Sequence, residues 1–271
     1  MALVERVKGL TVAASLANRA VREPQGTFLL HQHHPITFGE VESRSEALAA
    51  AFASLGVERN DRIALILHPC PEFLISLFAA AKLGAVVVPM NPHLSKPELR
   101  YMLRHSEAAL VVSVENHGGE DFLSLFDELL PQLPELQYVV TVGEEDLWYD
   151  DQIFQFEDLL SSGEGRDYPL VDVHPDEDSF AILYTAGTMG KPKGVELTHA
   201  NLLEVAAQTA HSLGLSPEDR IIGVTAFFHV FGLAMGILGP VLSGATLILQ
   251  TGFGAAETLA LIQRHRATAH Y

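Results

Sequence analysis

The stretch Asp61–Pro89, DRIALILHPCPEFLISLFAAAKLGAVVVP, contains the pattern that sets the fold class. The runs 61–67 and 85–89 predict β-strands, and the second is wholly apolar, as expected of a strand buried on both faces. The run 71–83 between them predicts a helix that ends at Gly84. A strand, a helix and a second strand in this order predict two parallel strands joined by a crossover helix.

The same alternation extends in both directions along the chain. Two capping boxes, one from Thr37 to Glu40 and one from Ser95 to Glu98, predict helix starts. Further strands are expected at 108–114 and 138–142, and another runs from 179 into a loop. The segments 115–135 and 143–178 are more acidic and less periodic, so we interpret them as excursions at the edge of the sheet. The predicted fold class is α/β, with parallel or mixed β-sheets and helices packed on both faces.

The overall charge limits the classes of partner. The 271 residues include 34 Asp and Glu against 17 Lys and Arg, a formal net charge of −17. Because so acidic a chain repels polyphosphate backbones, we expect no nucleic-acid binding, and any anion site must be local, made of backbone N–H groups and one or two lysines. The single cysteine, Cys70, excludes an internal disulfide and fits a reducing compartment. The N-terminal apolar run is short and interrupted by polar residues, so we expect a cytoplasmic protein.

A long uncharged stretch is compatible with either a membrane span or a buried core. No Asp, Glu, Lys or Arg occurs between Arg220 and Glu257, which is long enough to cross a bilayer. Glycines and a proline interrupt this stretch, and both of its ends, residues 221–228 and 245–250, have the composition of β-strands. We therefore expect a strand, a buried helix and a second strand here, and no transmembrane span.

The segment Tyr184–His199, YTAGTMGKPKGVELTH, follows a predicted strand and has the composition of a phosphate-binding loop. Only two residues separate Gly187 from Gly190, and Pro192 follows the next lysine, so it is not a Walker A loop. The G-x-G-x-x-G dinucleotide pattern is absent too. The glycines permit positive φ and close approach of backbone N–H groups to an anion, while the threonines and lysines add donors and charge. Composition alone leaves open a flexible surface hairpin.

The order of residues in this loop closely resembles the signature of the adenylate-forming superfamily, which includes acyl-CoA synthetases, luciferases of the firefly type and peptide-synthetase adenylation domains. The resemblance covers nearly the whole chain. Residues 36–113 are similar to the family's N-terminal region, and residues 227–249, FFHVFGLAMGILGPVLSGATLIL, resemble its aromatic–histidine segment in the form common among fatty-acyl-CoA ligases. It implies a truncated N-terminal AMP-binding domain over 1–271, with one subregion from 1–60 plus 218–271 and another from 61–217.

The resemblance also implies a chemistry and the residues that perform it. In that family the loop surrounds the β- and γ-phosphates of Mg-ATP while a carboxylate attacks the α-phosphate, and CoA then displaces AMP to form a thioester. This implies a fatty-acid–CoA ligase whose partners are a small-molecule carboxylic acid, ATP and CoA, with Mg²⁺. The implied phosphate-binding residues are Thr185, Ala186, Gly187, Thr188, Met189, Gly190 and Lys193, and Thr185 is also implied to lie near Mg²⁺. The implied catalytic residue is His229, which would position the carboxylate, and the implied acyl pocket consists of Phe228, Val230, Phe231 and Gly232.

The loop departs from the family pattern at two positions. Ala186 stands where a serine is usual and Met189 where a second threonine is usual, so two hydroxyl donors are missing. The loss at Ala186 is tolerable because backbone N–H groups make most of the phosphate contacts. A bulky thioether at Met189 predicts weaker use of ATP than a standard loop would give.

Several family motifs that follow this region do not occur in the chain, among them those of the C-terminal lid domain with its catalytic lysine. We therefore expect a fragment that does not catalyse the full reaction alone, with an interrupted final strand whose open edge permits a homodimer. Two alternatives stay open: a naturally short, non-catalytic nucleotide-binding or regulatory module, and an adenylate-forming enzyme for an aryl acid. The segment 225–236 contains no aspartate for a substrate amine, which argues against an amino acid.

The histidines at 31, 33 and 34 raise the question of a metal site. No carboxylate or cysteine lies near them in the sequence. We interpret them as part of a solvated turn.

Overall fold

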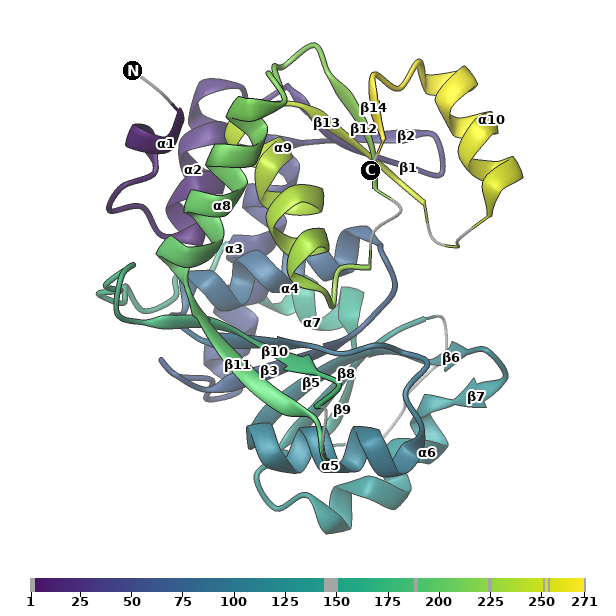
Figure 1. The fold of residues 1–271 in the computed structure, drawn as a ribbon. Coiled ribbons are helices and arrows are strands. Elements are labelled where there is room, and N and C mark those ends of the chain that lie inside the picture. The colour runs from purple at the N-terminus through teal and green to yellow at the C-terminus, as the bar shows by residue number, and fades with distance from the viewer. Residues whose placement is uncertain are drawn as a thin grey trace.

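The computed structural model describes residues 3–143, 151–187, 190–223, 226–250, 252 and 254–270. Thr188 and Met189 of the predicted phosphate loop lie outside these ranges. The described residues form two large sheets with helices between and outside them (Figure 1). The predicted α/β class, with mixed sheets and helices on both faces, is confirmed.

The larger sheet has seven strands in the order β11-β10-β4-β3-β5-β8-β9. Its neighbours run parallel except β11, which returns antiparallel beside β10. The strands are β3 (Arg62–Ile66), β4 (Val86–Pro89), β5 (Ala108–Val114), β8 (Tyr138–Val142), β9 (Ile153–Gln155), β10 (Ser179–Thr185) and β11 (Lys193–Thr198). In register, Ile63 of β3 lies opposite Val87 of β4, so residues 61–89 form the predicted parallel pair.

The second sheet has five strands in the order β14-β12-β13-β1-β2 and joins the two ends of the chain. Leu29 of β1 pairs with Leu247 of β13, in parallel. The strands are β1 (Thr27–His31), β2 (His34–Thr37), β12 (Arg220–Gly223), β13 (Thr246–Leu249) and β14 (Ala269–His270). The short β14 forms one edge, and pairing of two copies through it stays a prediction.

Helices fill the space between the sheets and cover the outer face of the larger one (Figure 1). The crossover helix α4 lies between the sheets, and α2 and α3 pack against it. On the opposite face of the seven-stranded sheet lie α5 and α6. The bounds are α1 (Leu3–Arg6), α2 (Val12–Arg22), α3 (Phe38–Ser54), α4 (Pro71–Lys82), α5 (Lys96–Ser106), α6 (Phe122–Leu129), α7 (Phe156–Gly163), α8 (His199–Ser212), α9 (Gly239–Ser243) and α10 (Ala255–His265), with short helices η1 (Leu130–Gln132) and η2 (Gly232–Leu238). A two-stranded hairpin of β6 (Asn116–His117) and β7 (Glu120–Asp121) follows β5.

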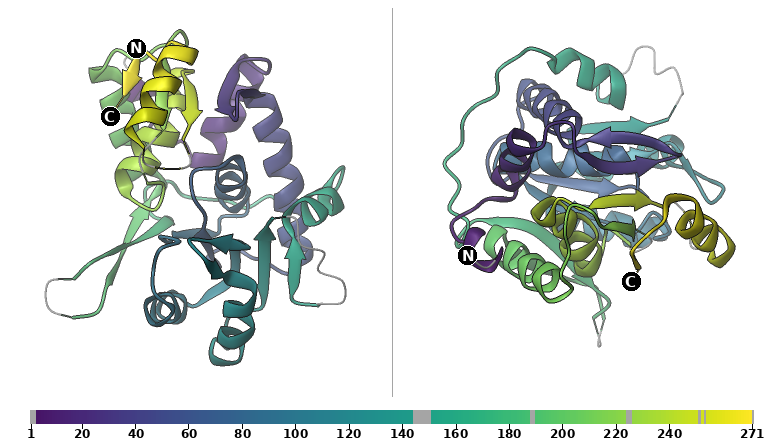
Figure 2. Two further views of the ribbon diagram at one scale, coloured as in Figure 1. Left: turned by 90° about the vertical axis from the view of Figure 1, so that its right-hand side faces the viewer. Right: turned by 90° about the horizontal axis from the view of Figure 1, so that it is seen from above.

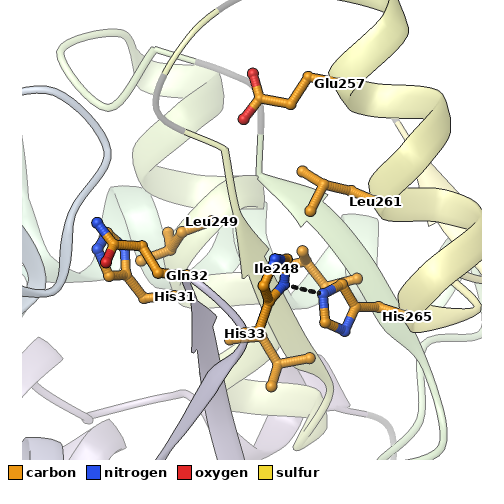
Figure 3. Close-up of a pocket in the computed structure, with 9 residues that line it drawn as sticks. His31, Gln32, His33, Ile248, Leu249, Glu257, Leu261 and His265 are labelled. Atoms are coloured by element: carbon orange, nitrogen blue, oxygen red, sulfur yellow. Dashed lines mark hydrogen bonds between the residues drawn. The ribbon is translucent and has the colours of Figure 1, made fainter.

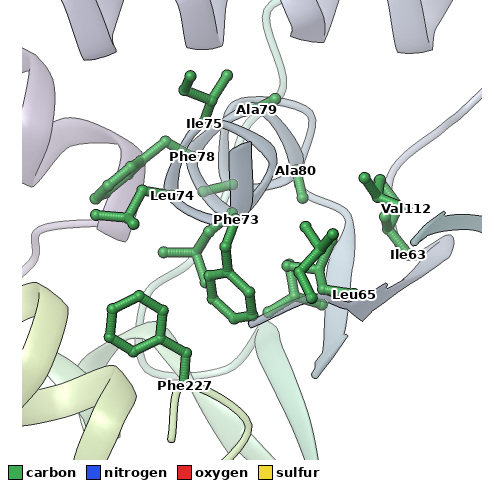
Figure 4. Close-up of a cluster of buried hydrophobic side chains, with 14 of the residues drawn as sticks. Ile63, Leu65, Phe73, Leu74, Ile75, Phe78, Ala79, Ala80, Val112 and Phe227 are labelled. Carbon is green, nitrogen blue, oxygen red and sulfur yellow. The ribbon is translucent and has the colours of Figure 1, made fainter. Parts of the chain in front are cut away.

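The centre of the hydrophobic core is α4, whose twelve residues are almost all buried (Figure 4). Phe73 and Phe78 project from it in different directions, and Ile63 and Leu65 of β3 lie beneath it. A helix that is apolar all round is buried all round. This packing explains why the stretch 61–89 dominates the fold.

The local predictions hold in most places. The Thr37–Glu40 capping box forms, with the Thr37 hydroxyl accepting from the Glu40 N–H at 3.1 Å. The predicted strand, buried helix and second strand in the uncharged stretch are β12, η2 with α9, and β13. Over the part of the chain that is described, every helix is too short or not apolar enough to cross a bilayer.

Two local interpretations need correction. The second acidic segment does supply the edge strand β9, but both segments are more regular than expected, because α6 places Phe122, Leu125 and Phe126 on one buried face and α7 does the same with its own apolar side chains. The strand expected to run through residue 228 ends at Gly223 in the described residues, and Phe227 and Phe228 form a turn before η2.

Candidate functional site

The predicted phosphate loop connects two antiparallel strands at the carboxyl end of β10 (green in Figure 2). Since β10 runs parallel to β4, the loop leaves the sheet at the edge where ligands bind in open α/β folds. Thr185 lies directly opposite Lys193 in the ladder. Opposed residues of an antiparallel pair share one face, so this hydroxyl and this ammonium group are on the same side of the hairpin. Both residues are exposed.

The glycines of the loop have backbone conformations that other residues rarely adopt. Gly187 has φ of 59°, and a Cβ added there would lie 2.6 Å from the carbonyl oxygen of Lys191. Gly190 has φ of 144°. A side chain at Gly187 therefore meets both backbone strain and a steric clash. Ala186 is exposed beside it, and the structure describes neither Thr188 nor Met189.

Helix α5 holds both ends of the loop in place. On the leading side, the Tyr184 hydroxyl donates to the carbonyl oxygen of Met102 at 3.2 Å and lies 2.8 Å from Nδ1 of His105. Burial raises the pKa of this phenol to about 12, so it stays protonated and available as a donor. On the trailing side, the Tyr101 hydroxyl donates to the carbonyl oxygen of Pro192 at 3.2 Å. The sequence analysis did not identify these anchors.

The two lysines of the loop have different surroundings. The Lys191 ammonium group lies 5.1 Å from the centre of the Tyr101 ring, over α5. Lys193 belongs to β11 and lies opposite Thr185. Of the two, Lys193 is therefore the lysine that shares a face with the threonine hydroxyl.

The aromatic–histidine segment follows β12 of the other sheet. Phe227 is buried, 1% exposed, and its ring lies 5.2 Å from that of Phe73 in the first turn of α4 (Figure 4). Because α4 follows β3, this contact seats the segment near the carboxyl edge of the seven-stranded sheet. Phe228 is half-buried, and Val230 and Phe231 are 39% and 40% exposed.

His229 is exposed and is oriented by its own turn. The Phe231 N–H donates to Nδ1 of His229 at 3.2 Å, so the neutral ring carries its proton on Nε2. The buried Gly232 allows a close approach, since a Cβ there would lie 2.1 Å from the carbonyl oxygen of Ala226. The turn thus presents an Nε2–H donor beside partly exposed apolar side chains. That combination suits a carboxylate attached to an apolar group.

Three histidines that the sequence analysis did not select lie shortly after the ends of neighbouring strands. His68 follows β3, His93 follows β4, and His117 follows β5. Nε2 of His93 and Nε2 of His117 are 3.1 Å apart, and the rings of His68 and His117 stack at 6.2 Å. Burial lowers the pKa of His68 and of His117. Their positions at the ends of adjacent strands follow from the sheet order and not from their spacing in the sequence.

The histidine-rich turn between β1 and β2 contacts α10. Gln32 and His33 have φ of 47° and 72°, and Nδ1 of His33 lies 3.0 Å from Nε2 of His265 (Figure 3). The turn is mostly exposed, and a cavity of about 370 Å³ opens beside it. Among the residues described, no group of three or more His, Cys, Asp or Glu side chains converges as a metal site.

Comparison with known proteins gives one consistent family. The AMP-binding enzyme family matches residues 16–271. The long-chain-fatty-acid–CoA ligase of Bacillus subtilis is 28% identical over 276 residues, which covers 95% of this chain and 49% of the ligase. A CoA ligase of Mycobacterium tuberculosis, specific by name for a methyl-dioxo-octahydroindenyl propanoyl group, is 33% identical over 261 residues, covering 95% of this chain and 50% of its own.

A solved structure agrees with the sequence relatives. The anthranilate CoA ligase in complex with anthranoyl-AMP superposes with a TM-score of 0.88 at 26% identity, covering 97% of this chain and 49% of the other. The chain therefore spans about half the length of the relatives that it matches.

Proposed function

The chain belongs to the AMP-binding enzyme family, and from this premise we propose that it forms the ATP-phosphate-binding part of an acyl-CoA ligase that activates a fatty acid. The carboxylate would attack the α-phosphate of ATP, forming an acyl-adenylate and releasing pyrophosphate. The thiol of CoA would then displace AMP. The observation that carries the proposal is the hairpin at the carboxyl end of β10, with its positive-φ glycines and with Thr185 and Lys193 on one face.

The proposed roles follow from the geometry of the loop. Gly187 and Gly190 would allow backbone N–H groups to approach the β- and γ-phosphates, and Lys193 would neutralise their charge. Thr188, Met189 and Ala186 complete the proposed loop by position in the sequence. The fixed ends of the loop on α5 would lower the cost of ordering it around the phosphates.

The residues present fit a magnesium ion held mainly by the substrate. Mg²⁺ binds through one or two protein ligands with phosphate oxygens and waters, and Thr185 offers one exposed hydroxyl on the face that it shares with Lys193. The ion would supply charge neutralisation at the phosphates. The protein side chains would supply position and the remaining positive charge.

His229 is the proposed positioning group for the acid. Its Nε2–H would donate to a carboxylate oxygen and hold the nucleophile in line with the α-phosphate. Phe228, Val230, Phe231 and Gly232 would form part of the wall around the acyl group. We favour a fatty acid because the partly exposed groups there are apolar and the Bacillus subtilis relative is named for long-chain fatty acids.

Binding of Mg-ATP tests the phosphate role directly. We expect calorimetry to show binding by this chain, and Lys193→Met to weaken it about 10-fold or more, since a hydrogen bond to a charged group contributes about 1.5–3 kcal/mol. Lys8→Met, an exposed lysine near the N-terminus, is the control. If Mg-ATP does not bind, or binds Lys193→Met as tightly as the wild type, the proposal is wrong.

Carboxylate-dependent ATP–pyrophosphate exchange then tests the chemistry and the acid. We would compare fatty acids of different length with aryl acids such as benzoate. Exchange that requires fatty acids supports the proposed substrate, whereas preference for the aryl acids replaces it. Binding of Mg-ATP without exchange would show that these residues hold the nucleotide but do not perform the first half-reaction by themselves.

A further inference from the structure

A second cavity lies beside the phosphate loop and is lined in part by the α5 residues that anchor the loop. It has a volume of about 940 Å³ and lies between α5 and the trailing end of the loop. Cavities of this size are typical of small-ligand sites. Its walls include Arg100, Tyr101, Arg104 and His105 from α5, and Lys191 and Pro192 from the loop.

The cavity has an excess of positive charge although the chain as a whole is strongly acidic. Arg100, Arg104 and Lys191 contribute three cations from two separate elements. Of the two carboxylates at its rim, Glu107 pairs with Arg62 at 2.9 Å, and Glu98 accepts the Ser95 N–H at 2.9 Å. Only the charge of Glu98 is therefore left to oppose the three cations. A local positive field in an acidic protein attracts small anions to that place.

Contacts with neighbouring residues orient two of these cations, Arg100 and Lys191, beside the cavity. Nη1 of Arg100 donates to Oε1 of Gln132 at 2.9 Å, which orients the guanidinium group from the neighbouring η1 helix. The Lys191 ammonium group lies over the Tyr101 ring. Aromatic contact and one hydrogen bond leave further donors on both groups. Multiple N–H donors that converge on one cavity match the several oxygens of a phosphate chain.

We propose that this cavity, between Arg100 and Arg104 of α5 and Lys191 of the loop, is a binding site for a diphosphate group. The diphosphate could be free inorganic pyrophosphate or part of a nucleotide. The site is separate from the proposed ATP-phosphate site, because Lys191 and Lys193 lie on different sides of Pro192 and contact different elements. It therefore does not require the loop to bind ATP.

Equilibrium dialysis with labelled inorganic pyrophosphate, in buffer without Mg²⁺, tests the site. We expect the double variant Arg100→Gln with Arg104→Gln to lose one equivalent of bound pyrophosphate, or to bind it about 10-fold more weakly. Both arginines are exposed, so the fold should be retained, which circular dichroism would verify. Arg166→Gln removes an exposed arginine outside the cavity and should change nothing.

Two further measurements separate this proposal from the proposed function. Lys193→Met, which changes a residue outside the cavity lining, should impair binding of Mg-ATP and leave the arginine-dependent pyrophosphate binding intact. The affinities of ADP and CoA are measured beside that of pyrophosphate. Tighter binding of ADP or CoA than of pyrophosphate indicates that the natural ligand is a nucleotide. Binding of ADP and CoA no tighter than that of pyrophosphate indicates the free anion. The proposal is overturned if the double variant retains wild-type binding, or if sulfate competes as effectively as pyrophosphate.

Discussion

Protonation of one buried histidine should determine much of the acid sensitivity of this chain. His199 begins α8, is 1% exposed and packs against the Phe180 ring at 4.9 Å. Its Nδ1 accepts the backbone N–H of Val12 at 3.1 Å, which ties α2 to α8, and its Nε2 is buried without a partner in the described residues. Burial lowers the pKa of His199 from 6.5 to about 4, against the smaller opposing effect of Asp178.

The sign of the effect follows from proton binding in the two states. Between about pH 6.5 and 4 the unfolded chain binds a proton at His199 and the folded chain does not, so the free energy of unfolding falls as the pH falls through this range. The full effect is about 3 kcal/mol, at about 1.4 kcal/mol for each tenfold change in proton affinity. Between pH 7.5 and 5 the expected share is about 2 kcal/mol. That is a large fraction of the stability of a typical domain.

Urea denaturation followed by circular dichroism at pH 7.5 and pH 5 measures this share. His199→Asn keeps an acceptor for the Val12 N–H but cannot be protonated, so its loss of stability over this range should be smaller by about 2 kcal/mol than in the wild type. Comparing the two pH values within each variant cancels the packing cost of the substitution. The exposed His211 of the same helix, changed to Asn, is the control. Equal pH dependence in His199→Asn and the wild type would refute the reasoning.

Three substitutions test other parts of the packing. The Lys82 side chain is only 4% exposed and pairs with Glu42 at 2.6 Å. Because Lys82→Met leaves a buried carboxylate without its partner, it should lower the free energy of unfolding in urea by about 3–5 kcal/mol. A loss of under about 1 kcal/mol would contradict this. A Cβ at Gly163 would lie 2.0 Å from the carbonyl oxygen of Ala47. Gly163→Ala should therefore separate α7 from α3 and lower the free energy of unfolding by about 1–3 kcal/mol. An unchanged melting temperature would show that the helices adjust freely. Tyr184→Phe removes the hydroxyl that donates to Met102. It should lower the free energy of unfolding by about 0.5–1.5 kcal/mol and weaken Mg-ATP binding. If neither quantity changes, Tyr184 does not anchor the loop.

Short-range patterns were enough to predict most strands and helices. Strands β5 and β8 have the predicted bounds because each is a compact apolar run between polar segments. The elements missed in the acidic segments carried a signal as well, since Phe122, Leu125 and Phe126 already have helical spacing. The high content of acidic residues around them obscured it. A test of periodicity in short windows would have found α6 and α7.

The candidate site was predictable only in part. The loop was found from its glycines, lysines and residue order, all of which are local. The anchors on α5 could not be found in this way, because Tyr184 contacts His105 and Met102, which are 79 and 82 residues away in the sequence. For the same reason the sequence could not assign different surroundings to Lys191 and Lys193, which stand two residues apart.

By itself, the sequence determined most of the strands and helices outside the acidic segments, the parallel crossover built on residues 61–89 and a glycine-rich loop after β10. These depend on hydrophobic period, capping and the backbone freedom of glycine, which act over a few residues. Only the tertiary structure decided that β10 lies beside β4 and β1 beside β13, that His199 is buried without charge, and that Lys191 faces α5. Each of these depends on which distant segments bury one another's apolar faces, and that is a property of the whole packed chain.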